Sequence, residues 1–552
     1  MRLLAADVAP AKRGGVLKRF WPWHLAALTL YAICAWAAVQ HGTPLTGMVS
    51  GGGSEPLQFI WFFAWWPYAL AHHLNPLFTQ MVWQPGGLNL AWATGVPVLA
   101  LLALPVTKLF GPVVVFNLCN LAAPIMAAFV AYALCLYVTR RPEAALLGGF
   151  LFGFSSYAMS RQSEQLNLET TFLLPCLVLL ALARLDVRVG RILTALLGAT
   201  MLAAMAGISL EMFATTVVAG GFAWALAWVL LPQRRGGLAL LAGDALLAAP
   251  LLLLLLAPLL WALFVQPHDV SLPKAWPFFF STDLLNLIIP TPTNAIGGVA
   301  FASVSRHFPG FVSEQSGYLG LPLIILLWLA LRAGRAYLRW LVLGLIIASL
   351  GPRLWLSGHD TGIPLPWMLI HALPLLGNAL PARMMLYASL AIAIVAALWV
   401  AEAPRRRLPL GLLAAAMLWP TPRPVQAIPH SAFFSPGRVG QVLGQGAKVA
   451  VLPFGFFSPS MYWQAESDFA FAQTGGYLGF PPQRVQQNTA LMRYFFGLEV
   501  PDIVPAFAAY CHETGTQYVV AGPGAPSDMV VGLRALGWPV RQVDDVTVFT
   551  VP

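Results

Sequence analysis

The sequence predicts an α-helical polytopic membrane bundle of about eleven transmembrane helices, followed by a small C-terminal α/β domain outside the membrane. Composition is the first reason: 59% of the 552 residues are hydrophobic and only 9% are charged, whereas soluble domains carry about 25% charged residues. The second is a series of apolar stretches long enough to cross a bilayer. The third is a change beyond Pro420, where the apolar segments become short.

The predicted spans, in chain order, are the apolar stretches 21–40, 113–138, 143–160, 168–184, 191–208, 210–231, 238–265, 317–332, 338–351, 383–401 and 407–420. Two further apolar stretches, 93–110 and 364–380, are interrupted by prolines. We expect these two to be interfacial or re-entrant helices packed on protein, because irregular backbone at membrane depth is tolerated only there or beside water.

Clusters of basic residues set the predicted topology, because Lys and Arg concentrate in cytoplasmic loops. If neither proline-broken stretch crosses, the following clusters all fall on one side: Lys12/Arg13/Lys18/Arg19, Arg140/Arg141, Arg184/Arg188/Arg191, Arg234/Arg235, Arg332/Arg335/Arg339 and Arg405/Arg406/Arg407. The N-terminus is then cytoplasmic, with an uncleaved first helix, and the C-terminus is outside. The net charge of +10 therefore reflects topology, and no nucleic-acid partner is expected.

The expected organisation has three parts. These are a cytoplasmic N-terminus at 1–20, a transmembrane domain at 21–420 with long outer loops at 41–112 and 266–316, and an extracytoplasmic α/β domain at 421–552. Short β-rich runs predict strands at 449–453, 517–520 and 546–551. Helices are expected near 501–514 and 527–536.

Glu55 is the first candidate for chemistry. It follows three glycines and Ser54, and Pro56 suits the first position of a helix expected at 57–74. That helix carries Trp and Tyr residues and should lie in the membrane interface, with its apolar face toward lipid or the bundle. The sequence allows two roles for Glu55: a carboxylate that complements the helix dipole, or the general base of an enzyme supplied with substrate by the membrane.

Two other outer loops carry polar candidates. In the loop 160–169, Arg161 and Glu164 either pair with each other or hold a phosphate and a sugar hydroxyl, with Gln162 as a further sugar-binding candidate.

In the loop 266–316, Ser281 or Thr282 is expected to cap a short helix whose first turn contains Asp283, another acceptor-binding candidate. The pair Arg306-His307 is a candidate for phosphate binding. Arg383, at the start of a span, either binds phosphate or extends toward the interface.

Several familiar signatures are missing from the sequence: the Walker loop, the dinucleotide fingerprint, His-Glu-x-x-His and Gly-x-Ser-x-Gly. The isolated cysteines predict neither a disulfide framework nor a zinc site. We therefore expect no cofactor; a divalent metal stays open as an alternative that no motif supports.

Several stretches together resemble the GT-C superfamily of integral-membrane glycosyltransferases, in the bacterial type that uses polyprenyl-phosphate sugars. They are Gly53-Ser-Glu-Pro56, the aromatic run through Trp66, Trp83-Gln-Pro-Gly-Gly-Leu-Asn-Leu90 and Phe152-Gly-Phe-Ser-Ser-Tyr157, within an architecture covering 20–420. The resemblance implies that Glu55 is the catalytic carboxylate and that Glu164 stands where the second acidic patch is found. It also implies a multi-pass protein of the bacterial inner (plasma) membrane.

The sequence departs from that family at two points. Metal-dependent members have Asp-x-Asp in the second outer loop, whereas this chain has Ser163-Glu-Gln165, which puts a metal in doubt. The first loop carries Glu in place of the more usual Asp.

The function implied by the resemblance is transfer of a sugar from a polyprenyl-phosphate donor to an extracytoplasmic acceptor, a cell-envelope glycan, lipid or protein, by inverting displacement. Glu55 would be the base, and Arg306, Arg383 or Arg161 would stabilise the departing phosphate. The expected partners are the lipid-linked sugar, membrane lipids and the acceptor. The alternatives are a transporter or flippase of envelope lipids or glycans, for which Asp244 is the clearest charge within a span, and a non-catalytic envelope assembly protein.

Overall fold

The computed structural model describes residues 20–162, 164–269, 276–332, 334–369, 371 and 379–552. The first basic cluster, Ser163, and residues 370 and 372–378 of the proline-broken stretch 364–380 lie outside the described residues. The chain forms two compact units. Unit 1 comprises Met1–Thr43, Cys119–Leu256 and Pro273–Arg423, and unit 2 comprises Pro44–Leu118, Ala257–Leu272 and Pro424–Pro552.

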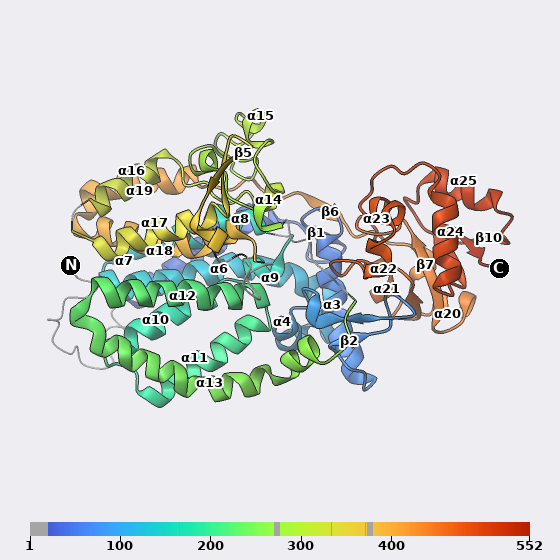
Figure 1. Cartoon of the computed structure of the whole chain (residues 1–552), viewed down its shortest axis with the longest axis horizontal. Helices are drawn as coiled ribbons and strands as arrows, with labels where there is room; N and C mark the ends of the chain where they lie inside the picture. Colours follow the sequence, from blue (N-terminus) through green and yellow to red (C-terminus); the bar gives the residue numbers. More distant parts are fainter. Residues whose placement is uncertain (1–19, 163, 270–275, 333, 370, 372–378) are drawn as a thin grey trace. The chain divides into compact units, whose positions relative to one another are not determined.

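Unit 1 is helical (Figure 1). Its main helices are α2 (Trp21–Ala35) with the π-turn η1 (Trp36–Gln40), α6 (Pro112–Thr139), α7 (Pro142–Gly153), α8 (Ser156–Arg161), α9 (Leu166–Glu169), α10 (Leu173–Leu185), α11 (Arg191–Ala206), α12 (Leu210–Leu230), α13 (Arg235–Phe264), α16 (Leu321–Leu331), α17 (Ala336–Ser349), α18 (Met385–Glu402) and α19 (Pro404–Met417). Helices α6 and α13 begin or end in unit 2.

Six helical segments of the described chain are long and apolar enough to cross a membrane. They are Trp21–Gln40, Pro112–Thr139, Leu166–Leu185, Leu210–Leu230, Pro232–Phe264 and Pro381–Glu402. All six coincide with predicted spans, which confirms a polytopic helical protein.

The other predicted spans form shorter helices. The stretch 143–160 is divided because Ser155 adopts an extended conformation and its hydroxyl accepts a hydrogen bond from the Ala158 amide at 3.3 Å, which starts α8 as a new helix. Helices α11, α16 and α17 have 16, 11 and 14 residues. The count of about eleven crossings therefore stays a prediction.

Helix α18 forms the core of unit 1, since 83% of the most apolar 18-residue stretch of Pro381–Glu402 is buried. It packs on α7, which lies beside it in Figure 1. Small residues allow α7 to approach its neighbours closely: a methyl group at Gly153 would lie 2.5 Å from Ala128 Cβ on α6. Glycine in the Phe-Gly-Phe stretch is thus explained by close packing between helices.

The long loops of unit 1 contain short elements. They are α14 (Trp276–Phe279), η4 (Leu284–Leu287), α15 (Ala302–Ser305), η5 (Val312–Glu314), the hairpin of β4 (Arg353–Leu356) and β5 (His359–Pro364), η6 (Pro366–Leu369) and η7 (Pro381–Met384).

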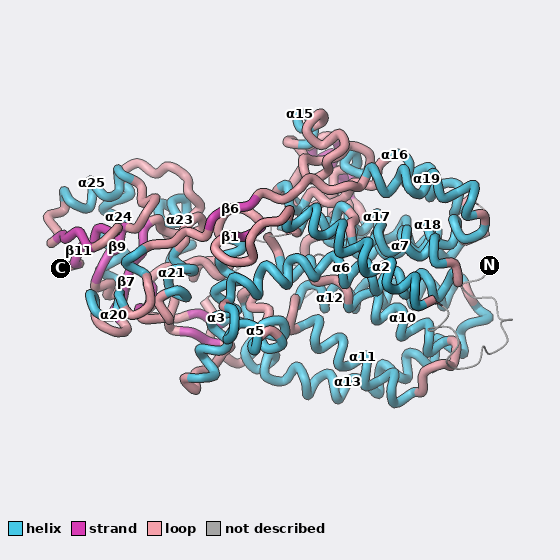
Figure 2. Tube along the Cα trace, turned by 180° about the vertical axis from the view of Figure 1, so that it is seen from behind, coloured by secondary structure: helices cyan, strands magenta, loops and turns pink. Residues whose placement is uncertain are grey.

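Unit 2 contains a five-stranded mixed sheet with strand order β10-β11-β9-β7-β8. Figure 2 labels three of its strands, β7, β9 and β11. The strands are β7 (Ala447–Leu452), β8 (Phe471–Gln473), β9 (Tyr518–Ala521), β10 (Val540–Val543) and β11 (Val546–Thr550). Strand β7 is parallel to β8 and β9, whereas β11 is antiparallel to β9 and β10. The accompanying helices are α20 (Arg438–Leu443), α21 (Ser460–Glu466), α22 (Gln483–Gln486), α23 (Thr489–Phe495), α24 (Ile503–Glu513) and α25 (Ser527–Ala535). The strands and helices expected in this region therefore occur within a few residues of their predicted positions.

The earlier part of unit 2 contributes α3 (Glu55–Ala71), α4 (Pro97–Leu102) and α5 (Leu104–Phe110), the small sheet of β2 (Phe78–Thr79) and β3 (Leu88–Asn89), and β1 (Met48–Ser50), which pairs with β6 (Val425–Ala427). The stretch 93–110 thus forms two short helices.

The aromatic face of α3 packs on protein. Trp61 and Trp65 are buried. Their rings stack at 5.3 Å and contact Phe469, and Trp61 Nε1 donates a hydrogen bond to Gln464 Oε1 at 2.8 Å. Burial of these large rings stabilises the packing of α3 on the C-terminal segment.

Candidate functional site

Glu55 is the first residue of α3. The preceding turn contains Gly51 at φ 108° and Gly53 at φ 72°, a backbone region that residues with a Cβ rarely adopt. Pro56 lies in the first helical turn, as expected, although the helix begins at 55 and ends at 71 rather than spanning 57–74. The carboxylate is half-buried at the N-terminal end of the helix, where the helix dipole favours negative charge.

The Glu55 carboxylate accepts hydrogen bonds from two neutral donors. Tyr477 Oη donates to Oε1 at 2.7 Å, and Gln58 Nε2 donates to Oε2. Gln58 is on the next turn of the same helix, but Tyr477 is 422 residues away. Sequence analysis missed Tyr477, because no local pattern links it to Glu55.

Unit 1 contains a separate polar cluster built around Glu314 (3% exposed). Arg161 Nη1 lies 2.5 Å from Glu314 Oε1, and Arg383 Nη2 lies 2.6 Å from the same oxygen. Arg383 also pairs with Glu211, through its Nη1. We call Arg161, Glu211, Glu314 and Arg383 the ion cluster.

Burial opposes ionisation of Glu314, but the two guanidinium groups outweigh it and lower the pKa of its carboxyl to about 2. A carboxylate with so low a pKa remains ionised near neutral pH and is a poor proton acceptor. The cluster contains two positive and two negative side chains, so its charges balance. Its arrangement resembles a structural ion network more than a base.

Of the two readings of Arg161 and Glu164, the structure does not support a pair, because the ion partner of Arg161 is Glu314. The Glu164 amide donates to the Arg161 carbonyl at 3.1 Å. Burial raises the pKa of Glu164, an effect that Arg423, Arg161 and a hydrogen bond with Ser313 oppose.

The other candidate side chains of unit 1 differ in burial and in whether they already have hydrogen-bond or ion-pair partners. Gln162 is buried and its Nε2 donates to the backbone and side-chain oxygens of Asn120 at 2.7 and 2.6 Å. Arg383 is mostly buried within the ion cluster and does not extend to the interface as one reading expected. Arg306 and His307, at the end of α15, are exposed. Neither side chain has a hydrogen bond or an ion pair within the described residues.

Asp283 is itself the N-cap of η4, which corrects the expected capping by Ser281 or Thr282. Its carboxylate accepts from the amides of Leu285 at 2.9 Å, Ser357 at 3.1 Å and Gly358 at 2.7 Å. It therefore ties η4 to the turn between β4 and β5. These bonds support a structural role.

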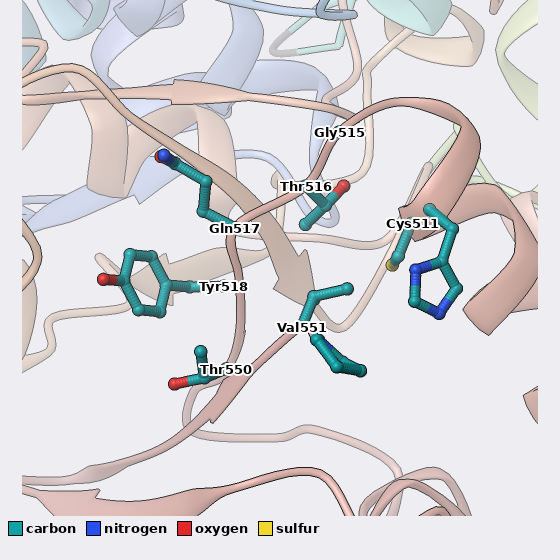
Figure 3. Close-up of a pocket in the computed structure, with 9 residues that line it drawn as sticks. Cys511, Gly515, Thr516, Gln517, Tyr518, Thr550 and Val551 are labelled. Carbon is teal, nitrogen blue, oxygen red and sulfur yellow. The ribbon is translucent and has the colours of Figure 1, made fainter.

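One hollow lies beside the ion cluster, and another lies in the C-terminal sheet region. A narrow cleft of about 10 Å³ beside Glu211 and Arg383 has room for about one water molecule. A shallow hollow of about 330 Å³ lies in the C-terminal sheet region, lined by residues from the end of α24, the start of β9 and the end of β11 (Figure 3). It contains none of the predicted site residues. Among the described residues, no group of three His, Cys, Asp or Glu side chains is arranged to hold a metal.

The sequence matches no family model and no curated protein. The fold, however, is similar to two solved glycosyltransferases. The mycobacterial arabinofuranosyltransferase AftD aligns with a TM-score of 0.60 at 14% identity, over 99% of this chain and 42% of that protein. The oligosaccharyltransferase of Archaeoglobus fulgidus, solved with zinc and sulfate, aligns with a TM-score of 0.50 at 13% identity, over 90% of this chain and 68% of that protein.

These similarities extend over nearly the whole chain, which spans about two fifths of the length of AftD. They show that this protein shares the fold of these two solved glycosyltransferases, in agreement with the resemblance seen in the sequence. Fold similarity at this identity does not assign a substrate.

Proposed function

We propose that this protein is a membrane glycosyltransferase that transfers a sugar from a polyprenyl-phosphate donor to an acceptor outside the cytoplasm, with Glu55 as the general base. The GT-C fold supports the reaction class. The observation that carries the assignment is the Glu55 carboxylate, which is half-buried and bonded to neutral donors. In this proposal the carboxylate takes the proton of the attacking acceptor hydroxyl.

The reaction is a single displacement. The acceptor hydroxyl oxygen forms a bond to the anomeric carbon while the bond from that carbon to the phosphate oxygen breaks. The hydroxyl proton passes to Glu55, and the electron pair leaves with the polyprenyl phosphate. One displacement inverts the anomeric configuration. General-base assistance of this kind contributes about 10²–10⁴-fold to the rate.

Arg306, assisted by His307, is the candidate for the donor phosphate. A phosphate that gains charge needs a cation whose charge is not already balanced. Arg161 and Arg383 share two carboxylates, whereas Arg306 is exposed and unpaired within the described residues. We therefore assign phosphate binding to Arg306 and a scaffolding role to the ion cluster.

A transporter is less well supported. The reading depended on Asp244, a charge within a predicted span. Its carboxylate lies 2.5 Å from Arg184 Nε and 3.4 Å from Arg191 Nε, on α10 and α11. Two cations therefore neutralise this acid, and helix packing is a sufficient explanation of its position.

The test is Glu55→Gln in membranes supplied with polyprenyl-phosphate-linked arabinofuranose and a panel of polyprenyl-phosphate-linked hexoses. Transfer to endogenous acceptors should fall at least about 100-fold, and the variant should accumulate like the wild type. Glu466→Gln is the matched control, because Glu466 is another partly buried carboxylate of unit 2 bonded to a tyrosine, Tyr462. Transfer by Glu55→Gln at the wild-type rate would eliminate the proposed base. The absence of transfer by the wild type across the panel would count against the lipid donor.

A further inference from the structure

The carboxylate assigned as the base is held by the C-terminal segment. Tyr477 belongs to the loop between β8 and α22, and its hydroxyl lies 2.7 Å from Glu55 Oε1. We infer that Tyr477 is a positioning residue for Glu55, fixing the orientation of its carboxylate and limiting its basicity. This inference rests on the proposed function, because it concerns the same base.

Tyr477 is well placed to act as a fixed donor. Its ring is 9% exposed and meets Phe456 edge-on, with ring centroids 4.6 Å apart. The start of its loop is anchored to the sheet, since the Thr474 amide donates to the Val449 carbonyl at 3.0 Å. Tyr510 Oη donates to the Thr474 carbonyl in turn. Because its loop is anchored in this way, the Tyr477 hydroxyl has a fixed position and restricts the movement of the Glu55 carboxylate.

In this pair Tyr477 is the hydrogen-bond donor and Glu55 is the acceptor. Burial, and then the nearby charge of Glu55, raise the pKa of Tyr477 well above its usual value. The phenol therefore keeps its proton and donates to the carboxylate. A donated hydrogen bond favours the ionised form of a carboxylate, so the base stays charged to lower pH. Gln58 donates to the second oxygen of the carboxylate and restrains it in the same way.

Other titratable groups lie on the elements packed against α3. Helix α21 carries Glu466, whose carboxylate is bonded to His430 and Tyr462. Helix α5 carries the exposed Lys108. Glu55 also has at least one contact beyond Gln58 and Tyr477. The effect of Tyr477 must therefore be measured as a difference between matched variants.

The experiment compares the pH dependence of kcat/KM for the wild type, Tyr477→Phe and Tyr462→Phe, in membranes supplied with the lipid-linked sugar that the wild type uses. Tyr477→Phe keeps the ring and removes the donor. We expect its kcat to fall about 10- to 100-fold, in proportion to one hydrogen bond to a charged group. The acid limb of its profile should move to higher pH, because the ionised base has lost a donor.

Tyr462→Phe is the control, since its hydroxyl also donates to a carboxylate of unit 2, Glu466 Oε1 at 3.3 Å. Its profile should match the wild type. Gln58→Met removes the other donor and should shift the acid limb in the same direction as Tyr477→Phe, which gives a second measurement if Tyr477→Phe accumulates poorly.

The outcomes separate the two claims. An unmoved acid limb in both Tyr477→Phe and Gln58→Met, with Glu55→Gln inactive, would overturn the positioning role and leave the base in place. Full activity of Glu55→Gln would overturn both. A shift caused by Tyr462→Phe as large as that caused by Tyr477→Phe would also contradict the inference, because a distant structural change would then be enough.

Discussion

Glu55 in unit 2 and Glu314 in unit 1 are both carboxylates with several partners, and the nature of those partners separates them. Glu55 is half-buried and accepts from a phenol and an amide, both neutral. Glu314 is buried between two arginines. A phenol and an amide bring no charge to a carboxylate, whereas two guanidinium groups neutralise it. Hydrogen bonding alone therefore does not identify a base; the charge of the donors must be considered.

The strongest test of this comparison is Glu314→Gln. This substitution removes the counter-charge of the buried Arg161 and one of the two counter-charges of Arg383. Removing one partner of a buried pair destabilises a protein by about 3–5 kcal/mol. We expect a large loss of thermal stability in detergent or of accumulation in membranes, while Glu55→Gln should be as stable as the wild type. Equal stability of the two variants would mean that the ion cluster does not hold unit 1 together.

The pH dependence of stability offers a second contrast. The pKa of Glu314 in the folded protein, about 2, is below its usual value of 4.5. Its contribution is therefore complete above the usual value and is lost as the pH falls from there toward the folded value. The difference in unfolding free energy between the wild type and Glu314→Gln should be constant from neutral pH to about 4.5 and shrink below it. A difference that grows on acidification would contradict the sign of this linkage.

The same comparison can be made for the cations. Arg306 is exposed, whereas the arginines of the ion cluster are paired with carboxylates. A hydrogen bond to a charged group contributes about 1.5–3 kcal/mol, so Arg306→Gln should raise the KM for the lipid-linked sugar about 10- to 100-fold with unchanged stability. Arg353→Gln is the control, since Arg353 is another exposed arginine of unit 1 that is paired with Asp360 at 3.3 Å. Equal effects of both substitutions would indicate general electrostatics rather than a phosphate site.

The smallest expected effect concerns metals. This chain has Ser163-Glu-Gln165 where metal-dependent members of the superfamily that it resembles have Asp-x-Asp. Turnover measured after dialysis against EDTA should therefore equal that of the untreated protein. Loss of turnover that Mn²⁺ or Mg²⁺ restores would show that the departure from Asp-x-Asp at Ser163-Glu-Gln165 does not make the protein independent of metal.

Sequence patterns predicted the local structure well. Pro56 placed the start of α3 to within two residues, and short β-rich runs identified β7, β9 and β11. These features depend on residues close together in the chain. The choice of interaction partner does not: Arg161 pairs with Glu314 instead of nearby Glu164, and Tyr477 reaches Glu55 across 422 residues. Such partners are set by tertiary packing, which composition cannot reveal.

The sequence pattern also did not show which tryptophans of α3 are buried. The tryptophans of α3 have the composition of a membrane-interface belt, yet Trp61 packs against the C-terminal segment. An aromatic ring suits either environment, so its position depends on which surface tertiary packing presents to it.

The central claim is that Glu55 accepts the proton of the attacking hydroxyl. Single-turnover transfer by Glu55→Gln, loaded with the same lipid-linked sugar as the wild type, tests it most directly. We predict donor binding within about twofold of the wild type and a transfer rate lower by about 10²–10⁴-fold. A variant that binds the donor and transfers the sugar as fast as the wild type would contradict the claim.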